Sequence, residues 1–167
     1  MYRQSLSIRL YEQSGQALVR TSIDSEEIFE EDKETGHIYV LSSESDDPAV
    51  KGIPNLYKIG DSRGEVKKRI SNAEKDPTYL MAPVKVMDDY KVYKAQPSKV
   101  EALIHKLFAP ARLDLTQIDA KGKDYDPSEW FMVPLKEVQK GIELIVSGDV
   151  IYYNYDRQLQ KLVPNEH

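Results

Sequence analysis

The sequence contains no cysteine, and its histidines are confined to positions 37, 105 and 167. A chain without cysteine forms no disulfide and no thiolate metal site, which fits a reducing compartment. It also lacks an apolar run of the about 20 residues that span a membrane, and its first residues lack the pattern of a signal peptide. With 167 residues, 40% of them hydrophobic and 31% charged, the sequence predicts a globular protein of the cytoplasm.

Several common catalytic motifs are missing as well. The stretch GDSRGEVKKR at 60–69 does not have the glycine spacing or the Gly-Lys-Ser/Thr ending of a phosphate-binding loop. No GxGxxG motif for a dinucleotide is present, and without a GxSxG elbow a Ser-His-Asp hydrolase is disfavoured. A metal cage built from histidine and cysteine is excluded by the composition.

Charge is distributed unevenly along the chain, whose formal net charge is -5. Residues 1–47 carry a net charge of -7, residues 48–113 carry +6, and residues 114–167 carry -4. A basic segment of this kind is what a polyanion requires, because its binding displaces condensed counterions. Lysines clustered on solvated faces would give the same numbers, so charge alone leaves both interpretations open.

The pattern of apolar residues divides the chain into strands and helices. The expected strands form a hairpin within 4–23 and then lie at 37–43, 56–60, 82–95 (bent or broken at Asp88 and Asp89) and 129–133. The expected helices lie at about 63–76, 98–112 and 134–148, with an acidic helix or linker at 25–36 and a strand or packed extension after 148. Ser98 is expected to cap the second helix, with Glu101 as the acid of a capping box.

Three short motifs stand in a particular order: YKIG at 57–60, EALIH at 101–105 and EWF at 129–131. A strand with a tyrosine precedes them, and a basic helix follows the first. From about His37 to Val138 this order resembles the GIY-YIG nuclease superfamily, and is most similar to its phage-type branch with Lys-Ile-Gly in the second strand. The resemblance implies an α/β (α+β) fold with a small, mainly antiparallel three-stranded sheet flanked by helices.

The same resemblance implies a division of the chain into three parts. Residues 1–35 would form an N-terminal hairpin and acidic linker, residues 36–148 the nuclease domain, and residues 149–167 a C-terminal extension. Members of the superfamily often attach this domain to others, so an additional domain or partner would supply DNA specificity. The oligomeric state is left open.

The resemblance also implies an activity, the metal-dependent hydrolysis of DNA phosphodiester bonds by an endonuclease. Carried over by position, Tyr39 is the first tyrosine, Arg69 holds the phosphate, and Glu101 binds Mg²⁺ or Mn²⁺. A single carboxylate with several waters suits Mg²⁺, which gives up water reluctantly. His105 lies one helical turn after Glu101 and would contact the phosphate or the ligand carboxylate.

Tyr57 and Lys58 compete for one place in this site. Side chains alternate along a strand, so only one of the two shares a face with Tyr39. Counting back from Gly60, Lys58 occupies the place of the second tyrosine, and it is the preferred candidate as a phosphate contact or a base. Tyr57 would replace it if a bulge shifted the alternation.

Two functions of other classes stay open. His37 stands where the superfamily has glycine, and Asp61 stands where it has a basic residue that would hold phosphate. Asp61 would repel phosphate there, unless it caps the helix while Arg63 or Lys67 supplies the lost charge, or serves as a second metal contact. These departures favour a degenerate domain that binds nucleic acid without cutting it. The acidic flanking segments favour a protein-interaction domain instead.

Overall fold

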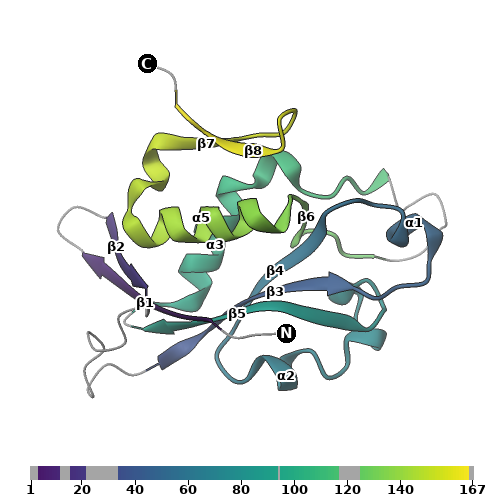
Figure 1. The fold of residues 1–167 in the computed structure, drawn as a ribbon. Coiled ribbons are helices and arrows are strands. Elements are labelled where there is room, and N and C mark those ends of the chain that lie inside the picture. Colours follow the sequence, from purple (N-terminus) through teal and green to yellow (C-terminus); the bar gives the residue numbers. More distant parts are fainter. Residues whose placement is uncertain (1–3, 12–15, 22–33, 94, 117–124, 166–167) are drawn as a thin grey trace.

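A computed structural model of the chain describes residues 4–11, 16–21, 34–93, 95–116 and 125–165 and shows a mixed α+β fold (Figure 1). The strands are β1 (Gln4–Tyr11), β2 (Gln16–Thr21), β3 (Glu34–Ser43), β4 (Leu56–Ser62), β5 (Val84–Tyr93), β6 (Trp130–Met132), β7 (Tyr153–Asp156) and β8 (Lys161–Pro164). The helices are α1 (Pro48–Lys51), α2 (Val66–Arg69), α3 (Pro97–Leu107) and α5 (Leu135–Ser147). Short 3₁₀ turns are η2 (Ala73–Lys75), η3 (Pro77–Tyr79), η4 (Ala109–Ala111) and η5 (Asp149–Tyr152).

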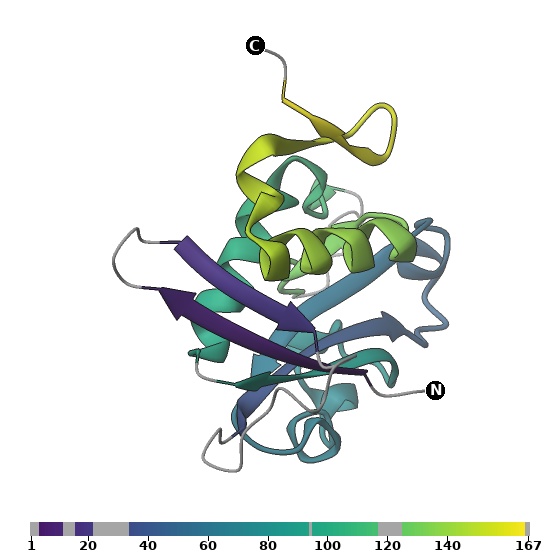
Figure 2. The same ribbon diagram turned by 60° about the vertical axis from the view of Figure 1, so that its left-hand side comes forward.

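Four antiparallel strands in the order β5-β3-β4-β6 form one end of the sheet, rather than the predicted three, and β6 is the edge strand. The fourth arises because the short strand expected at 129–133 pairs with β4, with Lys58 opposite Trp130. The described pairing of β1 and β2 extends this sheet to six strands, since β1 lies parallel to β5 (Figure 2). The acidic linker predicted at 25–36 lies mostly outside the described residues.

Strand β5 runs through its Asp-Asp pair without a break. Its register against β3 shifts by one residue, because Val40 pairs with Asp88 and the next residue, Leu41, pairs with Val86. Met87 is therefore an extra residue, and the expected bend is a β-bulge.

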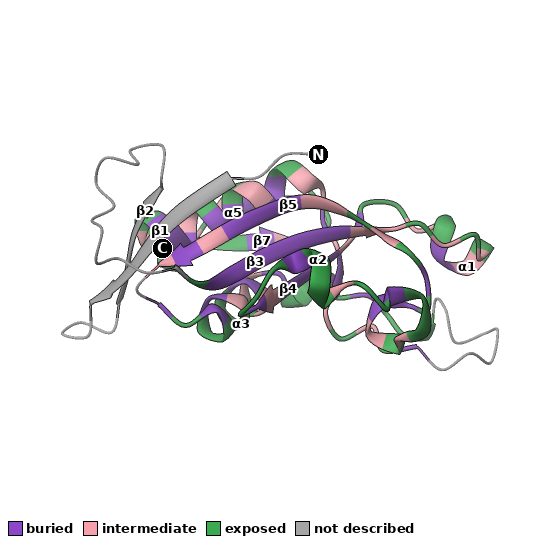
Figure 3. Cartoon of the chain, turned by 90° about the horizontal axis from the view of Figure 1, so that it is seen from below, coloured by how far each residue is buried: buried purple, intermediate pink, exposed green. Residues whose placement is uncertain are grey.

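Helices cover the two faces of the sheet unequally. The larger core lies between the sheet and helices α3 and α5, which occupy the same side in Figure 1. On the other face, the short α2 and the turns after it cover a smaller cluster around Tyr39, Leu41 and Tyr79. Figure 3 views this face and shows that most of α2 is exposed.

Two helical predictions are wrong in their details. Helix α3 begins at Pro97, because the fixed φ of proline suits the first helical position and its missing N–H needs no partner there. Gln96 is the N-cap, and it makes no side-chain capping hydrogen bond. Ser98 is thus not the cap, and Glu101 is not the acid of a capping box. Helix α2 has only four residues instead of the segment 63–76, because serine and asparagine follow Ile70 and favour turns.

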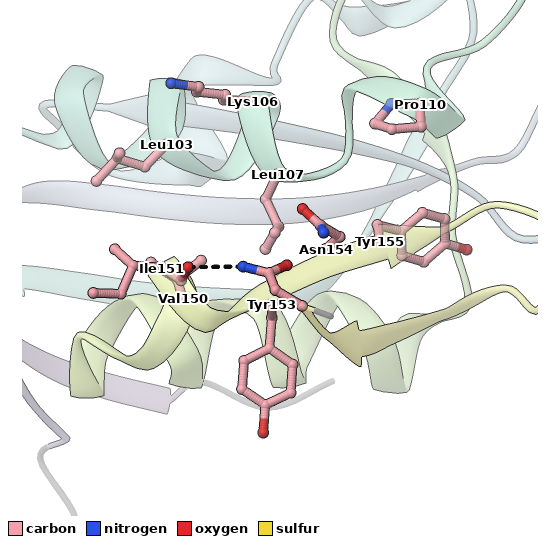
Figure 4. Close-up of a pocket in the computed structure, with 10 residues that line it drawn as sticks. Leu103, Lys106, Leu107, Pro110, Val150, Ile151, Tyr153, Asn154 and Tyr155 are labelled. Atoms are coloured by element: carbon pink, nitrogen blue, oxygen red, sulfur yellow. Dashed lines mark hydrogen bonds between the residues drawn. The ribbon is translucent and has the colours of Figure 1, made fainter. Parts of the chain in front are cut away.

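The C-terminal segment packs against α5 and α3. The carboxylate of Glu137 is buried and accepts a hydrogen bond of 2.7 Å from the backbone N–H of Leu162. The rings of Phe108 and Tyr155 meet edge to face, 5.3 Å apart. A hollow of about 530 Å³ remains between α3 and this segment (Figure 4). Its lining includes no acidic side chain and no histidine, so it does not suit hydrolytic chemistry.

None of the helices in the described ranges is both long enough and apolar enough to pass through a membrane.

Candidate active site

The candidate site lies at the edge of strand β4. Strand β6 pairs with β4 only at Leu56, Tyr57 and Lys58, and the backbone N–H of Ile59 donates to the Glu129 carbonyl over 3.1 Å. Of the described strands, only β3 pairs with the rest of β4. Side chains from both faces of the sheet therefore meet around this edge.

Lys58 and Tyr39 share one face of the sheet, as the alternation along β4 predicts. Tyr39 pairs with Gly60 and Lys58 pairs with Leu41, so their side chains point toward α2. Lys58 is fully buried, and Tyr39 is 1% exposed. Tyr57 lies on the opposite face, half-buried against the larger core. The structure therefore separates Tyr57 from the other predicted site residues on the α2 side.

Gly60 provides the space in which the ring of Tyr39 lies. A Cβ atom added to Gly60 would stand 2.5 Å from Cζ and from the hydroxyl oxygen of Tyr39. Real Cβ atoms do not approach this closely, so any larger residue displaces the ring or the strand. The glycine of YKIG is thus explained by close packing.

Replacing Gly60 by alanine is expected to lower the free energy of unfolding by about 1–3 kcal/mol, because the added methyl overpacks the Tyr39 ring. Urea titration of the variant measures this loss. Gly64→Ala is the matched control, since a Cβ there meets no atom within 4 Å. Equal stability of the two variants would show that the ring moves at no cost.

The buried ammonium of Lys58 has one carboxylate partner, Glu129, with which it forms a hydrogen-bonded ion pair. Its Nζ also lies 5.1 Å from the ring centroid of Tyr79 and 5.9 Å from that of Tyr39. Aromatic faces attract a cation at such distances. The Glu129 side chain is 30% exposed, so the partner of the fully buried Lys58 ammonium is in contact with solvent.

Two tyrosines connect this charge to Arg69. The hydroxyls of Tyr39 and Tyr79 lie 3.3 Å apart, and the Tyr79 hydroxyl donates to the backbone carbonyl of Arg69 over 3.3 Å. Burial, and then the hydrogen bond to Tyr79, raises the pKa of Tyr39 far above its ordinary value. Burial also raises the pKa of Tyr79, although the charge of Arg69 acts in the opposite direction. Both phenols are therefore neutral near pH 7 and act through hydrogen bonds.

On the α3 side of the edge, Glu101 meets Asp61. The pKa of Glu101 is raised to about 8 by burial, by a hydrogen bond with the Asp61 side chain and by the negative charges of Glu129 and Asp61. Two carboxyls that share a hydrogen bond hold a proton between them. The hydrogen bond and the raised pKa thus show that two carboxyls lie close together at this edge.

His105 fixes α3 against β4. Its Nε2 donates to the backbone carbonyl of Ile59 over 2.7 Å, and its ring lies 5.0 Å from that of Phe131. The pKa of His105 is lowered, chiefly by burial, so the ring is neutral at pH 7. A neutral ring with its proton on Nε2 leaves Nδ1 unprotonated, and Nδ1 lies 3.9 Å from the Glu101 carboxylate.

The residues present fit a divalent cation such as Mg²⁺. Within the described ranges, no group of three or more His, Asp or Glu side chains is arranged to hold a metal ion. Mg²⁺, however, is commonly held by one or two carboxylates and completed by waters and substrate phosphate. Glu101 and Asp61 supply such a pair, and an ion there would replace their shared proton.

The sequence did not indicate two members of this site. Tyr79 lies in η3 and gave no signal beyond an ordinary turn after Pro77. Glu129 belongs to the quoted motif EWF, and the sequence suggested for it only that it helps Trp130 to close the core. His37, which stands where the GIY-YIG pattern has glycine, is buried and has a polar partner. Its Nδ1 lies 2.6 Å from Asp89 Oδ1.

The fold is mixed α+β. The candidate site combines buried tyrosines, a buried lysine and paired carboxyls at one edge of the sheet. Residues 36–146 match the T5orf172 domain, and the chain belongs to this family. The T5orf172 domain is associated with nuclease or DNA-binding function. The predicted membership of the GIY-YIG superfamily is wrong, since no GIY-YIG family matches. The three motifs that suggested it are too short to discriminate between families.

The chain is similar to the uncharacterized protein YeeC of Bacillus subtilis (strain 168). The two are 42% identical over 146 residues, which make up 87% of this chain and 38% of YeeC. The chain thus spans well under half of the length of this relative. No solved structure matches the chain.

Proposed function

We propose that the chain is a metal-dependent endonuclease that hydrolyses phosphodiester bonds of DNA in the cytoplasm. The observation that carries the proposal is the Glu101–Asp61 pair, in which burial and a neighbouring carboxylate raise the pKa of Glu101 to about 8. Strongly perturbed carboxyls at an accessible edge are typical of functional sites. The association of the T5orf172 domain with nuclease or DNA-binding function supports the same conclusion.

Each side chain has a role that follows from its exposure. Arg69 is exposed and would bind the phosphate that is cut. Glu101 and Asp61 would hold Mg²⁺ or Mn²⁺, which when bound neutralises the phosphate and activates water or the leaving oxygen. Lys58 is fully buried, so it would stabilise developing negative charge through the field of the site rather than by contact.

The remaining residues position these groups. Tyr39 and Tyr79 are each 1% exposed, and their hydrogen bonds hold the backbone of Arg69. His105 anchors α3, and with it Glu101, to the carbonyl of Ile59. Tyr57 lies on the other face of the sheet, where its side chain packs against the larger core. A further domain or partner would supply sequence specificity.

A second function, DNA binding without cleavage, is favoured by one observation. Tyr39 and Tyr79 are buried and Lys58 is paired with Glu129, so Arg69 is the member of this connected group that is exposed to a substrate. An arginine beside an anion site binds phosphate without any need for chemistry.

Incubation of the purified chain with supercoiled plasmid separates these functions. We expect nicking in Mg²⁺ or Mn²⁺ and none in EDTA, because the carboxyl pair needs a cation to bring the phosphate close. Binding that weakens with salt, without nicking, would support the second function instead. Absence of both would leave a protein-interaction domain.

A further inference from the structure

A shallow hollow of about 460 Å³ lies beside the candidate site, between the end of β4 and α2. It is lined by residues of one continuous segment: Asp61, Ser62, Arg63, Gly64, Glu65, Lys68 and Arg69. Arg69 lines this hollow and also belongs to the tyrosine chain. The hollow is therefore continuous with the site proposed for the phosphate that is cut.

Three cations surround this hollow: Arg63, Lys68 and Arg69. Arg63, Lys68 and Arg69 are exposed, and none of them forms an ion pair within the part of the chain that the structure describes. The acidic lining consists of Glu65 and of Asp61, whose carboxyl already shares a hydrogen bond with Glu101. Three cations that have no ion-pair partner among the described residues, gathered around a concave surface, form a site for an anion.

A hydrogen bond fixes the turn that carries Arg63, and the space beside Gly64 in this turn is open. The buried Ser62 side chain donates from Oγ to the Gly64 carbonyl over 2.6 Å. Gly64 presents no side chain, and even a Cβ there would have no neighbour within 4 Å. The space beside Gly64, in a hollow that Arg63 and Lys68 also line, is therefore open to an anion.

We propose that this hollow binds a second phosphate of the nucleic-acid strand, adjacent to the phosphate held by Arg69. Arg63 and Lys68 contact its oxygens, and Arg69 lies between the two phosphates. The inference rests on the proposed function for its substrate class, a nucleic-acid backbone, but it does not need cleavage to occur. Contacts to a phosphate outside the reacting bond set register and affinity, and leave the chemical step unchanged.

Fluorescence anisotropy with a labelled DNA duplex in EDTA tests this site without cleavage. Arg63→Gln and Lys68→Gln are each expected to weaken binding by about tenfold, and to reduce the slope of log affinity against log salt by about 1. Lys136→Gln is the control, because Lys136 is a lysine of α5 outside the hollow and its loss changes the net charge equally. Equal effects of all three variants would overturn the proposal.

A short duplex with one neutral methylphosphonate at its centre tests the contact without reference to a cleavage site. The unchanged protein is expected to lose affinity for this duplex, whereas Arg63→Gln is expected to bind both duplexes alike. Additive losses would overturn the assignment. If no duplex is cut but these binding effects appear, the hydrolytic function fails and the second phosphate site stands. Normal cleavage with an unchanged KM in Arg63→Gln would instead overturn the second phosphate site and leave the hydrolytic function standing.

Discussion

A Glu101→Gln variant is expected to cut DNA at least about 1000-fold more slowly while it binds DNA as tightly as the unchanged chain in EDTA. The amide cannot replace the carboxylate that holds the cation, and a bound metal is worth several kcal/mol to such a reaction. Nicking of supercoiled plasmid in Mg²⁺ measures the rate. Glu143→Gln, an exposed position on α5, is expected to leave the rate unchanged.

The same variant is expected to gain stability at alkaline pH in the absence of metal. The pKa of Glu101 rises from 4.5 to about 8 on folding, so the native state binds this proton more tightly than the unfolded chain. Stability is therefore lost as the pH rises from about 4.5 through about 8. Glutamine cannot ionise, so the Tm of Glu101→Gln is expected to fall less over that range.

Loss of activity together with a gain in stability separates function from structure. If Glu101 were purely structural, its replacement would lower the stability of the protein. Cleavage would then fall only because part of the protein is unfolded. Full nicking by Glu101→Gln would remove the metal assignment. A Tm that follows pH as in the unchanged chain would contradict the shared proton.

Replacing Glu129 by alanine is expected to lower the free energy of unfolding by about 3 kcal/mol, the largest loss of stability predicted for this protein. The change leaves the fully buried ammonium of Lys58 without its carboxylate partner. Breaking a buried ion pair from one side costs about 3–5 kcal/mol, and the partial exposure of Glu129 places the loss near the lower end.

A second substitution identifies the cause of this loss. Lys58→Met removes the buried charge and fills a similar volume. The double variant Lys58→Met/Glu129→Ala is therefore expected to have a free energy of unfolding within about 1 kcal/mol of that of the unchanged chain. Urea titrations of both single variants and the double variant give the coupling energy. Glu65→Ala, at an exposed position, is the control. A loss no greater in Glu129→Ala than in Glu65→Ala would contradict the buried pair.

Local patterns predicted the parts of the fold that depend on neighbouring residues. Alternation along β3 and β4 placed Tyr39 and Lys58 on one face, because consecutive side chains of a strand point in opposite directions. Helix α5 ends where Gly148 takes a left-handed conformation with φ of 84°, a position that glycine favours. Where two local rules competed, at Pro97 and Ser98, the fixed backbone of proline decided the start of α3.

The site itself depends on contacts between distant parts of the sequence, which no local pattern contains. Lys58 and Glu129 are 71 residues apart, and Tyr39 and Tyr79 are 40 apart. From the sequence, Asp61 was expected to repel phosphate, with a helix cap or a second metal contact as alternatives, and packing places it beside Glu101 as half of a carboxyl pair. The role of such a residue depends on its neighbour across the sheet edge, and only the folded chain supplies that neighbour.

The C-terminal hairpin of β7 and β8 supports a buried residue inside the family domain. The match to the T5orf172 domain ends at residue 146, yet Leu162 belongs to the buried core and its N–H satisfies the carboxylate of Glu137 inside the domain. A buried carboxylate without that donor is costly. Loss of the hairpin would therefore remove both the donor of Glu137 and the buried Leu162, so the chain beyond the family match contributes to the stability of the domain.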